Sequence, residues 1–160
     1  AAGAATAYFS QNPHAPFRWT EQRGLLTMMG LGFIVVSMSG AITALGDTLF
    51  PVQAAEHSGL LAQVTNELSA TQHFLVRLRI IHPILALILG GFMIWAFDHL
   101  REHTAGKIAL VGMVLSISQI GLGLLNVALA APGWMQLIHL GMAQALWIGL
   151  VLTGWRAQLR

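Results

Sequence analysis

Two histidines lie inside long apolar segments that contain no Asp, Glu, Lys or Arg: His82 in residues 80–97 and His139 in residues 133–155. An ionisable side chain within a membrane helix usually faces the interior of the helix bundle and has a function there. A neutral imidazole is a good ligand for iron, and a haem iron takes one axial ligand on each side of a flat macrocycle. The pair therefore predicts axial haem ligation, if the fold brings both side chains to one depth.

The composition predicts an all-α integral membrane four-helix bundle around these histidines. Of the 160 residues, 56% are hydrophobic and only 9% are charged, whereas soluble domains carry about a quarter charged residues. Each charge-free segment is long enough to cross a hydrocarbon core of about 30 Å. The segments are 24–46, 80–97, 108–131 and 133–155.

Charge and cysteine content exclude several classes of function. The formal net charge is only +2 and no basic stripe is present, so the sequence predicts no nucleic-acid partner. The chain has no cysteine, which excludes disulfides, thiolate metal sites and cysteine nucleophiles. With nucleic acid excluded, the partner that the apolar composition predicts is the lipid bilayer.

The domain organisation follows from the apolar segments. The sequence predicts an irregular leader over 1–23, a haem-binding bundle over 24–155 and a cytoplasmic tail over 156–160. The long connection before the second helix holds a weak candidate for a short interfacial helix at 54–64 and a capping box from Ser69 to Gln72. The four membrane helices are expected at about 24–45, 72–99, 107–131 and 134–155.

The basic residues predict the topology. Six of them lie on one side of the predicted bundle, and only Arg77 and Arg79 lie on the other. Because cytoplasmic segments carry the excess of Lys and Arg, both termini are expected in the cytoplasm and the connection 46–72 outside, in a bacterial inner (plasma) membrane. The second and fourth helices then both begin outside, so each histidine lies in the outer half of its helix.

A short internal repeat also relates the two halves of the chain. Gly40 precedes Pro51 by the same 11 residues by which Gly121 precedes Pro132. In addition, Ile-His opens the second helix at His82 much as it opens the fourth at His139. The pattern favours two helical hairpins in the same orientation.

Several residues near the histidines have two possible roles. Arg77 and Arg79 stand where haem propionates need cations, or they anchor lipid phosphates. Small residues on the same helices leave width for a porphyrin, or they serve close helix packing. The histidines themselves are haem ligands, or they form hydrogen bonds between helices. The small residues are Gly90, Gly91, Gly141, Ala143 and Ala145; the polar residues Gln119, Asn126 and Gln144 are further candidates to bond one another, a quinone or a substrate.

Four stretches of the chain resemble the haem A synthase family, the membrane enzymes that convert haem O to haem A for cytochrome oxidases. They are SGAITALGDTLFP at 39–51, FLVRLRIIHP at 74–83, LGLLNV at 122–127 followed by Ala131-Pro132, and LIHL at 137–140 followed by Leu146-Trp147. These motifs are long and occur in order, and the likeness covers most of residues 24–152.

The resemblance implies a fold and a cofactor. The family builds eight helices from two similar four-helix halves, each with a histidine pair near the outer face. One half holds the haem substrate, and the other holds a haem b that serves electron transfer. His82 and His139 match one such pair, and the chain is most similar to the second, haem b-binding half.

The chain departs from the family pattern at two points. The catalytic half of the family has a glutamate three residues before the second-helix histidine, where this chain has Arg79, and many members carry a cysteine pair that this chain lacks. No catalytic residue is therefore assigned. The chain is expected to be half of a longer protein, a half-length homologue that forms a homo-oligomer, or a relative within a respiratory complex.

These observations leave three functions open. The first is a haem A synthase-like protein that binds haem b, with haem O or haem A as substrate or product. The second is an electron-transfer cytochrome subunit without catalysis of its own. The third is a structural subunit that holds no haem.

Overall fold

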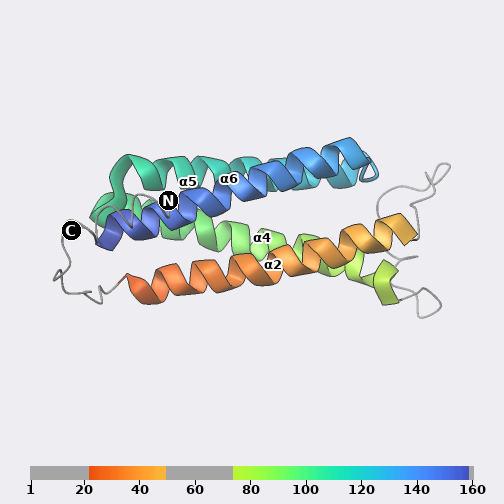
Figure 1. The fold of residues 1–160 in the computed structure, drawn as a ribbon, viewed down its shortest axis with the longest axis horizontal. Coiled ribbons are helices and arrows are strands. Elements are labelled where there is room, and N and C mark those ends of the chain that lie inside the picture. The colour runs from red at the N-terminus through yellow and green to blue at the C-terminus, as the bar shows by residue number, and fades with distance from the viewer. Residues whose placement is uncertain (1–21, 50–73, 159–160) are drawn as a thin grey trace, which may run out of the picture.

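The computed structural model describes residues 22–49 and 74–158, and these residues form helices joined by short turns (Figure 1). The long helices are α2 (Arg23–Leu49), α4 (Phe74–Leu100), α5 (Gly106–Ala128) and α6 (Gly133–Gln158), and the π-helix η1 (Arg101–Ala105) joins α4 to α5. All four long helices are long and apolar enough to cross a membrane, so the predicted all-α membrane bundle is confirmed. The predicted leader, the short helix and cap in the connection, and the last two residues lie outside the described part of the chain.

The helices form a ring in chain order. Each of α2, α4 and α5 packs along the next helix, and α6 returns to touch α2 over a smaller area. The rings of Phe33 on α2 and Trp147 on α6 close this last contact, with their centroids 5.3 Å apart. Because α5 lies between them, α4 and α6 occupy opposite corners of the ring, and these are the helices that carry the two histidines.

Apart from Met135 near the start of α6, the buried apolar side chains gather in one half of the bundle, which we call the core half. The cluster comprises Met29, Met93, Ala96, Phe97, Leu100, Ala105, Ala109, Leu146 and Leu150. Two buried hydroxyls in this half, on Ser116 and Thr153, donate to the carbonyl oxygens of Gly112 and Gly149 on their own helices, at 2.9 and 2.8 Å. The other half contains both histidines, and we call it the histidine half.

Glycines allow the helices to approach closely. A Cβ atom on Gly112 would lie 2.4 Å from the ring of Phe97, and one on Gly90 would lie 2.6 Å from Ile120. The open side of Gly90 is thus filled by α5, so this glycine serves helix packing and leaves no width for a porphyrin. Gly91 and Gly141 are exposed, and nothing lies within 4 Å of a Cβ built on either of them.

Helix α2 is longer than the sequence predicts, since it continues through Gly46 to Leu49. Side-chain hydroxyls support its last turns: Thr43 donates to the carbonyl oxygen of Ser39, and Thr48 donates to that of Ala44, both at 3.0 Å. A glycine within an apolar membrane helix does not have to end it, because neighbouring helices and hydroxyl groups satisfy the backbone.

Helix α5 ends three residues earlier than predicted, in a left-handed turn. The N–H of Ala131 donates to the carbonyl of Asn126 and the N–H of Ala130 donates to that of Val127, at 2.8 and 3.0 Å. This is the Schellman arrangement, which usually places glycine at its left-handed position. Here Ala130 and Ala131 occupy that region, with φ of 58° and 54°. Pro132 then leads directly into α6.

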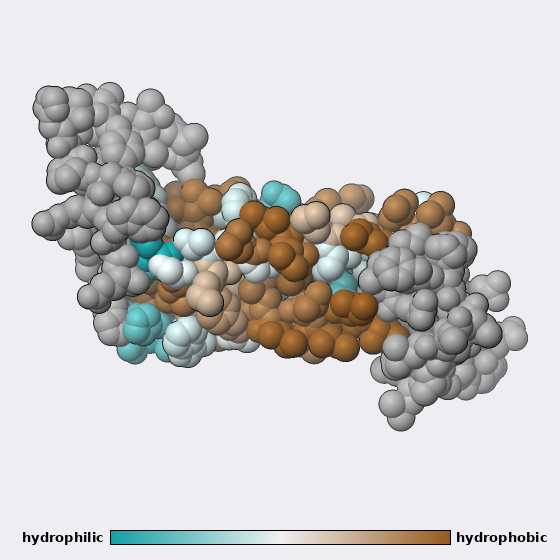
Figure 2. All heavy atoms as spheres, turned by 90° about the horizontal axis from the view of Figure 1, so that it is seen from below, coloured by the Kyte–Doolittle hydropathy of each residue, from teal (hydrophilic) through white to brown (hydrophobic). Residues whose placement is uncertain are grey.

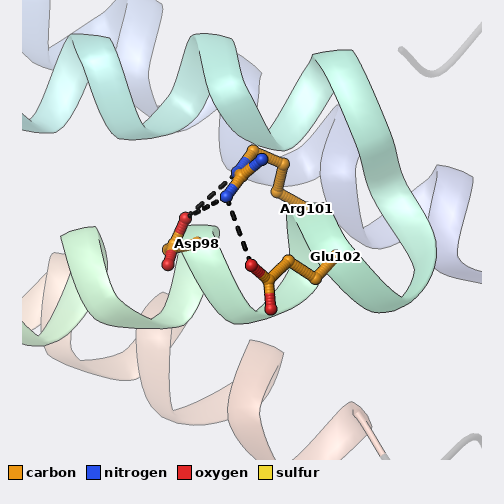
Figure 3. A network of polar contacts seen from close by, with 3 residues as sticks. All are labelled: Asp98, Arg101 and Glu102. Carbon is orange, nitrogen blue, oxygen red and sulfur yellow. Dashed lines mark hydrogen bonds and ion pairs between the residues drawn. The ribbon is translucent and has the colours of Figure 1, made fainter.

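The polar groups at the η1 end form an ion-paired network (Figure 3). Nε and Nη2 of Arg101 both donate to Oδ1 of Asp98, at 3.0 and 2.8 Å, and Nη2 also lies 3.4 Å from Glu102. The hydrogen bonds that Arg101 donates to Asp98, together with the negative charge of that carboxylate, raise the pKa of Arg101, so the guanidinium stays charged. Such an exposed network contributes little to stability. Between the two ends of the bundle, Figure 2 shows a broad apolar band, with hydrophilic side chains gathered mainly near the η1 end.

Candidate haem-binding site

The two histidines lie on the inward stripes of α4 and α6. Three buried residues of α4 correspond to three buried residues of α6 at a constant spacing of 57 in residue number. The pairs are Met93 with Leu150, Ala96 with Thr153, and Leu100 with Ala157. His82 and His139 are separated by the same 57 residues, so each lies 18 residues before the last buried pair.

This spacing gives the histidines the same depth. At 1.5 Å per helical residue, both lie about 27 Å from the level of Leu100 and Ala157. Both side chains are half-buried, on helices at opposite corners of the ring.

A hydrogen-bond relay fixes the orientation of His82. Oγ of Ser39 lies 2.9 Å from Nδ1 of His82 and donates its own proton to the carbonyl oxygen of Val36, at 2.8 Å. With the hydroxyl proton given to Val36, the serine oxygen accepts from His82, and Nδ1 carries the hydrogen in this arrangement. The lone pair of the neutral ring is then on Nε2, which is the state required of a metal-binding imidazole.

His139 is held differently. Its Nε2 lies 3.1 Å from Nε2 of Gln119, an amide nitrogen that can only donate, so the imidazole nitrogen accepts. Among the described residues, Nδ1 of His139 and Oε1 of Gln119 are both buried without a hydrogen-bond partner, as is Oδ1 of Asn126 further along α5. A buried polar atom without a partner costs about 1–3 kcal/mol, so this corner of the bundle is polar but unsatisfied.

The residues that contact the histidines hold equivalent positions in the two hairpins. Gln119 follows Ser39 by 80 residues, the spacing that also relates Gly112 to Gly32 and Ala109 to Met29. Both Ala109 and Met29 are buried, but Gly32 packs against Leu89 of the following helix, whereas Gly112 packs against Phe97 of the preceding one. The spacing of 80 is one residue shorter than the 81 between Gly40 and Gly121.

Each imidazole also rests on a glycine of the preceding helix. A Cβ atom on Gly40 would lie 2.9 Å from Cε1 of His82, and one on Gly123 would lie 3.3 Å from Cε1 of His139. Both glycines lie one turn or less from the hydrogen-bonding residue of the same helix. The glycine and the polar residue together position each ring.

The arginines proposed as propionate partners lie at the same end. Nη2 of Arg79 donates to the carbonyl oxygen of Gly46 at 3.0 Å, so this side chain ties the start of α4 to the end of α2. Arg77 belongs to α4, but its side chain lies outside the described part of the structure. In Arg79 the structure shows a helix-linking role that the sequence did not predict.

Ser39 is the residue whose part in the site was not predicted. It lies in one of the motif stretches, but a serine in an apolar helix usually bonds its own backbone, and only the packing of α2 on α4 reveals its second partner. Gln119 was recognised as an intramembrane polar residue without an assigned partner, and its partner is His139. Gln144 is exposed on α6.

Comparison with known proteins decides the family. The sequence matches the COX15-CtaA family, described as cytochrome oxidase assembly protein, over residues 2–151. The chain belongs to this family. This match confirms the resemblance to haem A synthases that the four motif stretches indicate.

Relatives of this COX15-CtaA protein include two from strains of Thermus thermophilus, both named protoheme IX farnesyltransferase. Each is 41% identical to it over 130 residues, which covers 78% of this chain. The chain spans only about a fifth (21%) of the length of these relatives. No solved structure matches the chain.

Proposed function

We propose that this COX15-CtaA chain binds haem b between His82 and His139 and supports the oxidation of haem O to haem A during cytochrome oxidase assembly. The observation that carries the proposal is the Ser39–His82 relay, since it leaves Nε2 of a membrane-embedded imidazole unprotonated and available. A histidine that only joined two helices would not need a defined tautomer. In haem and metal sites, by contrast, a hydrogen bond to the second ring nitrogen regularly orients the ligand.

The residues of the histidine half fit a haem. The two imidazoles project at equal depth from opposite corners of the ring, and the buried apolar cluster occupies the core half. Buried polar atoms of His139, Gln119 and Asn126 have no hydrogen-bond partner within the described residues. No group of three or more His, Cys, Asp or Glu gathers in the described residues, and a pair of axial ligands needs only two.

In this site each residue has a defined task. His82 and His139 would be the axial ligands, Ser39 would keep Nε2 of His82 unprotonated, and Gly40 would fix the plane of its ring. Arg77 and Arg79 would face the propionates. When bound, haem b would supply one-electron transfer to the reaction.

The wider setting of the proposal rests on the family and the relatives. We infer an integral protein of a bacterial inner membrane with both termini in the cytoplasm. A second four-helix half, a homo-oligomer or a respiratory complex would supply the catalytic residues that are not assigned here. The relatives' name denotes farnesyl transfer to a haem, which supports a place in haem modification.

A second candidate is a b-type electron-transfer subunit with no part in haem conversion. The replacement of the glutamate by Arg79 and the absence of cysteine favour it. The haem content separates the two, because only the synthase-like function predicts haem O or haem A beside haem b. A colourless purified protein would instead indicate a structural subunit.

The test is the reduced-minus-oxidised spectrum of the purified protein, followed by pyridine extraction of its haem. We expect a low-spin b-type spectrum, and its loss in His82→Ala combined with His139→Ala. The matched control is His99→Ala, because His99 is an exposed histidine at the other end of α4. A full haem complement in the double variant would show that the ligands lie elsewhere.

A further inference from the structure

The two imidazoles are unequal although their surroundings are equivalent in position. Ser39 bonds Nδ1 of His82 and leaves Nε2 available, whereas Gln119 bonds Nε2 of His139. The equivalent residues of the two hairpins therefore act on opposite nitrogens. Nε2 of His82 is available to bind iron. Nε2 of His139 is already hydrogen-bonded to Gln119.

We infer that Gln119 competes with the haem iron for Nε2 of His139, so that His82 is the permanent axial ligand and His139 the exchangeable one. The inference rests on the proposed haem site and adds to it a difference in strength between the two axial bonds. Gln119 is then a positioning residue, which acts on the haem only through His139.

Nε2 of His139 is engaged whichever amide atom of Gln119 faces the imidazole. With the amide nitrogen toward His139, as in the structure, the N–H donates to the lone pair of Nε2. If the amide were turned by 180°, its oxygen would accept a proton from Nε2, and the ring nitrogen would again have no lone pair to offer. In both cases the hydrogen bond must break before Nε2 can bind a metal.

Buried polar atoms without partners indicate that the hydrogen bond between Gln119 and His139 breaks readily. Nδ1 of His139 and Oε1 of Gln119 are both buried and have no hydrogen-bond partner among the described residues. The Gln119–His139 contact therefore leaves one buried polar atom of each side chain unsatisfied. An arrangement of this kind holds the ring in place without holding it strongly.

The inference is tested by haem titration and carbon monoxide binding in Gln119→Leu, which removes the amide and keeps a similar volume. The haem-free protein is titrated with haemin, and the ferrous complex is then titrated with carbon monoxide, which must displace an axial ligand. Removing the competing bond should tighten haemin binding and weaken carbon monoxide binding, each by roughly three- to tenfold. Gln144→Leu is the matched control, since Gln144 is exposed on α6.

The same substitution in two other backgrounds separates competition from a structural effect. In His82→Ala, where only His139 remains, Gln119→Leu should again tighten haemin binding. In His139→Ala it should change nothing, because the residue through which Gln119 acts is gone. Thermal unfolding of each haem-free variant checks that the bundle is intact.

Three results would overturn the inference. An equal change in all three backgrounds would make Gln119 a structural residue, and weaker haemin binding in Gln119→Leu would mean that the amide supports His139 as a ligand. If Gln119→Leu bound low-spin haem with unchanged carbon monoxide affinity, the inference would also be overturned, but the proposed haem site would remain intact. If the wild-type protein bound no haemin, the proposed function itself would fail.

Discussion

The hydroxyl of Ser39 on α2 and the imidazole of His82 on α4 are joined by a 2.9 Å hydrogen bond between Oγ and Nδ1. Because the hydroxyl proton is given to the carbonyl oxygen of Val36, this bond selects one tautomer of the histidine. The contact joins two helices that are separated by a long connection in the chain. It sets the chemistry of the histidine and also holds α4 against α2.

Ser39→Ala should weaken haem binding by about tenfold or more, because partners of this kind typically change metal affinity by 10–100-fold. The imidazole would lose its acceptor at Nδ1 and could rotate away from the bundle interior. Haemin titration measures the change, with Ser37→Ala as the control on an exposed position of the same helix. Equal haem affinity in wild type and Ser39→Ala would show that the relay does not position the ligand.

Gly40→Ala should displace the His82 ring, since the added Cβ would lie 2.9 Å from Cε1. The ring is held by Ser39 and cannot move without breaking that bond, so we expect a loss of haem affinity of about tenfold, similar to that of Ser39→Ala. The low-spin spectrum and haemin titration report the effect.

The control for this change is Gly30→Ala, a glycine of α2 with nothing within 4 Å of an added Cβ. It should leave the spectrum unchanged. If Gly30→Ala were as damaging as Gly40→Ala, the loss would be a general effect of changing glycines in α2.

Arg79→Leu distinguishes the two roles of this arginine. The structure shows Nη2 of Arg79 on the carbonyl of Gly46, and the proposal adds a haem propionate as a partner. If the propionate is a partner, Arg79→Leu should weaken binding of haemin by about tenfold and leave binding of haem dimethyl ester, whose propionates are uncharged, nearly unaffected.

Equal losses for both haems would instead mean that Arg79 acts only through the contact between α2 and α4. Arg101→Leu is the charge-matched control for this experiment. It lies at the opposite end of the bundle, in the ion-paired network with Asp98, and should not change the affinity for either haem.

Ala130→Gly should stabilise the protein by about 1 kcal/mol, because a left-handed φ costs an L-residue roughly this amount and costs glycine almost nothing. The φ of Ala130 is 58° in the turn that ends α5. Thermal unfolding in detergent measures the change. The control is Ala128→Gly, at the last helical residue, which should destabilise the protein or leave its stability unchanged. A loss of stability in Ala130→Gly would exclude the Schellman turn.

The sequence alone determined the fold class and the identity of the two histidines. Four charge-free segments of sufficient length can only be membrane helices, since water is absent from the hydrocarbon core and every backbone group must be bonded within its own segment. A histidine within such a segment stands out because the apolar residues around it offer no partner. His82 and His139 could therefore be selected without a structure.

Only the tertiary structure decided how each histidine is held. Ser39 and Gln119 lie 43 and 20 residues from their histidines, and hydroxyl and amide side chains in a helix have several possible partners. Helix packing selects one of these partners, and it also assigns Gly90 to a contact with Ile120 and Arg79 to the carbonyl of Gly46. Periodicity gives the face of a helix that a residue occupies, but the partner across the interface depends on the rotation and depth of two helices, which no local pattern specifies.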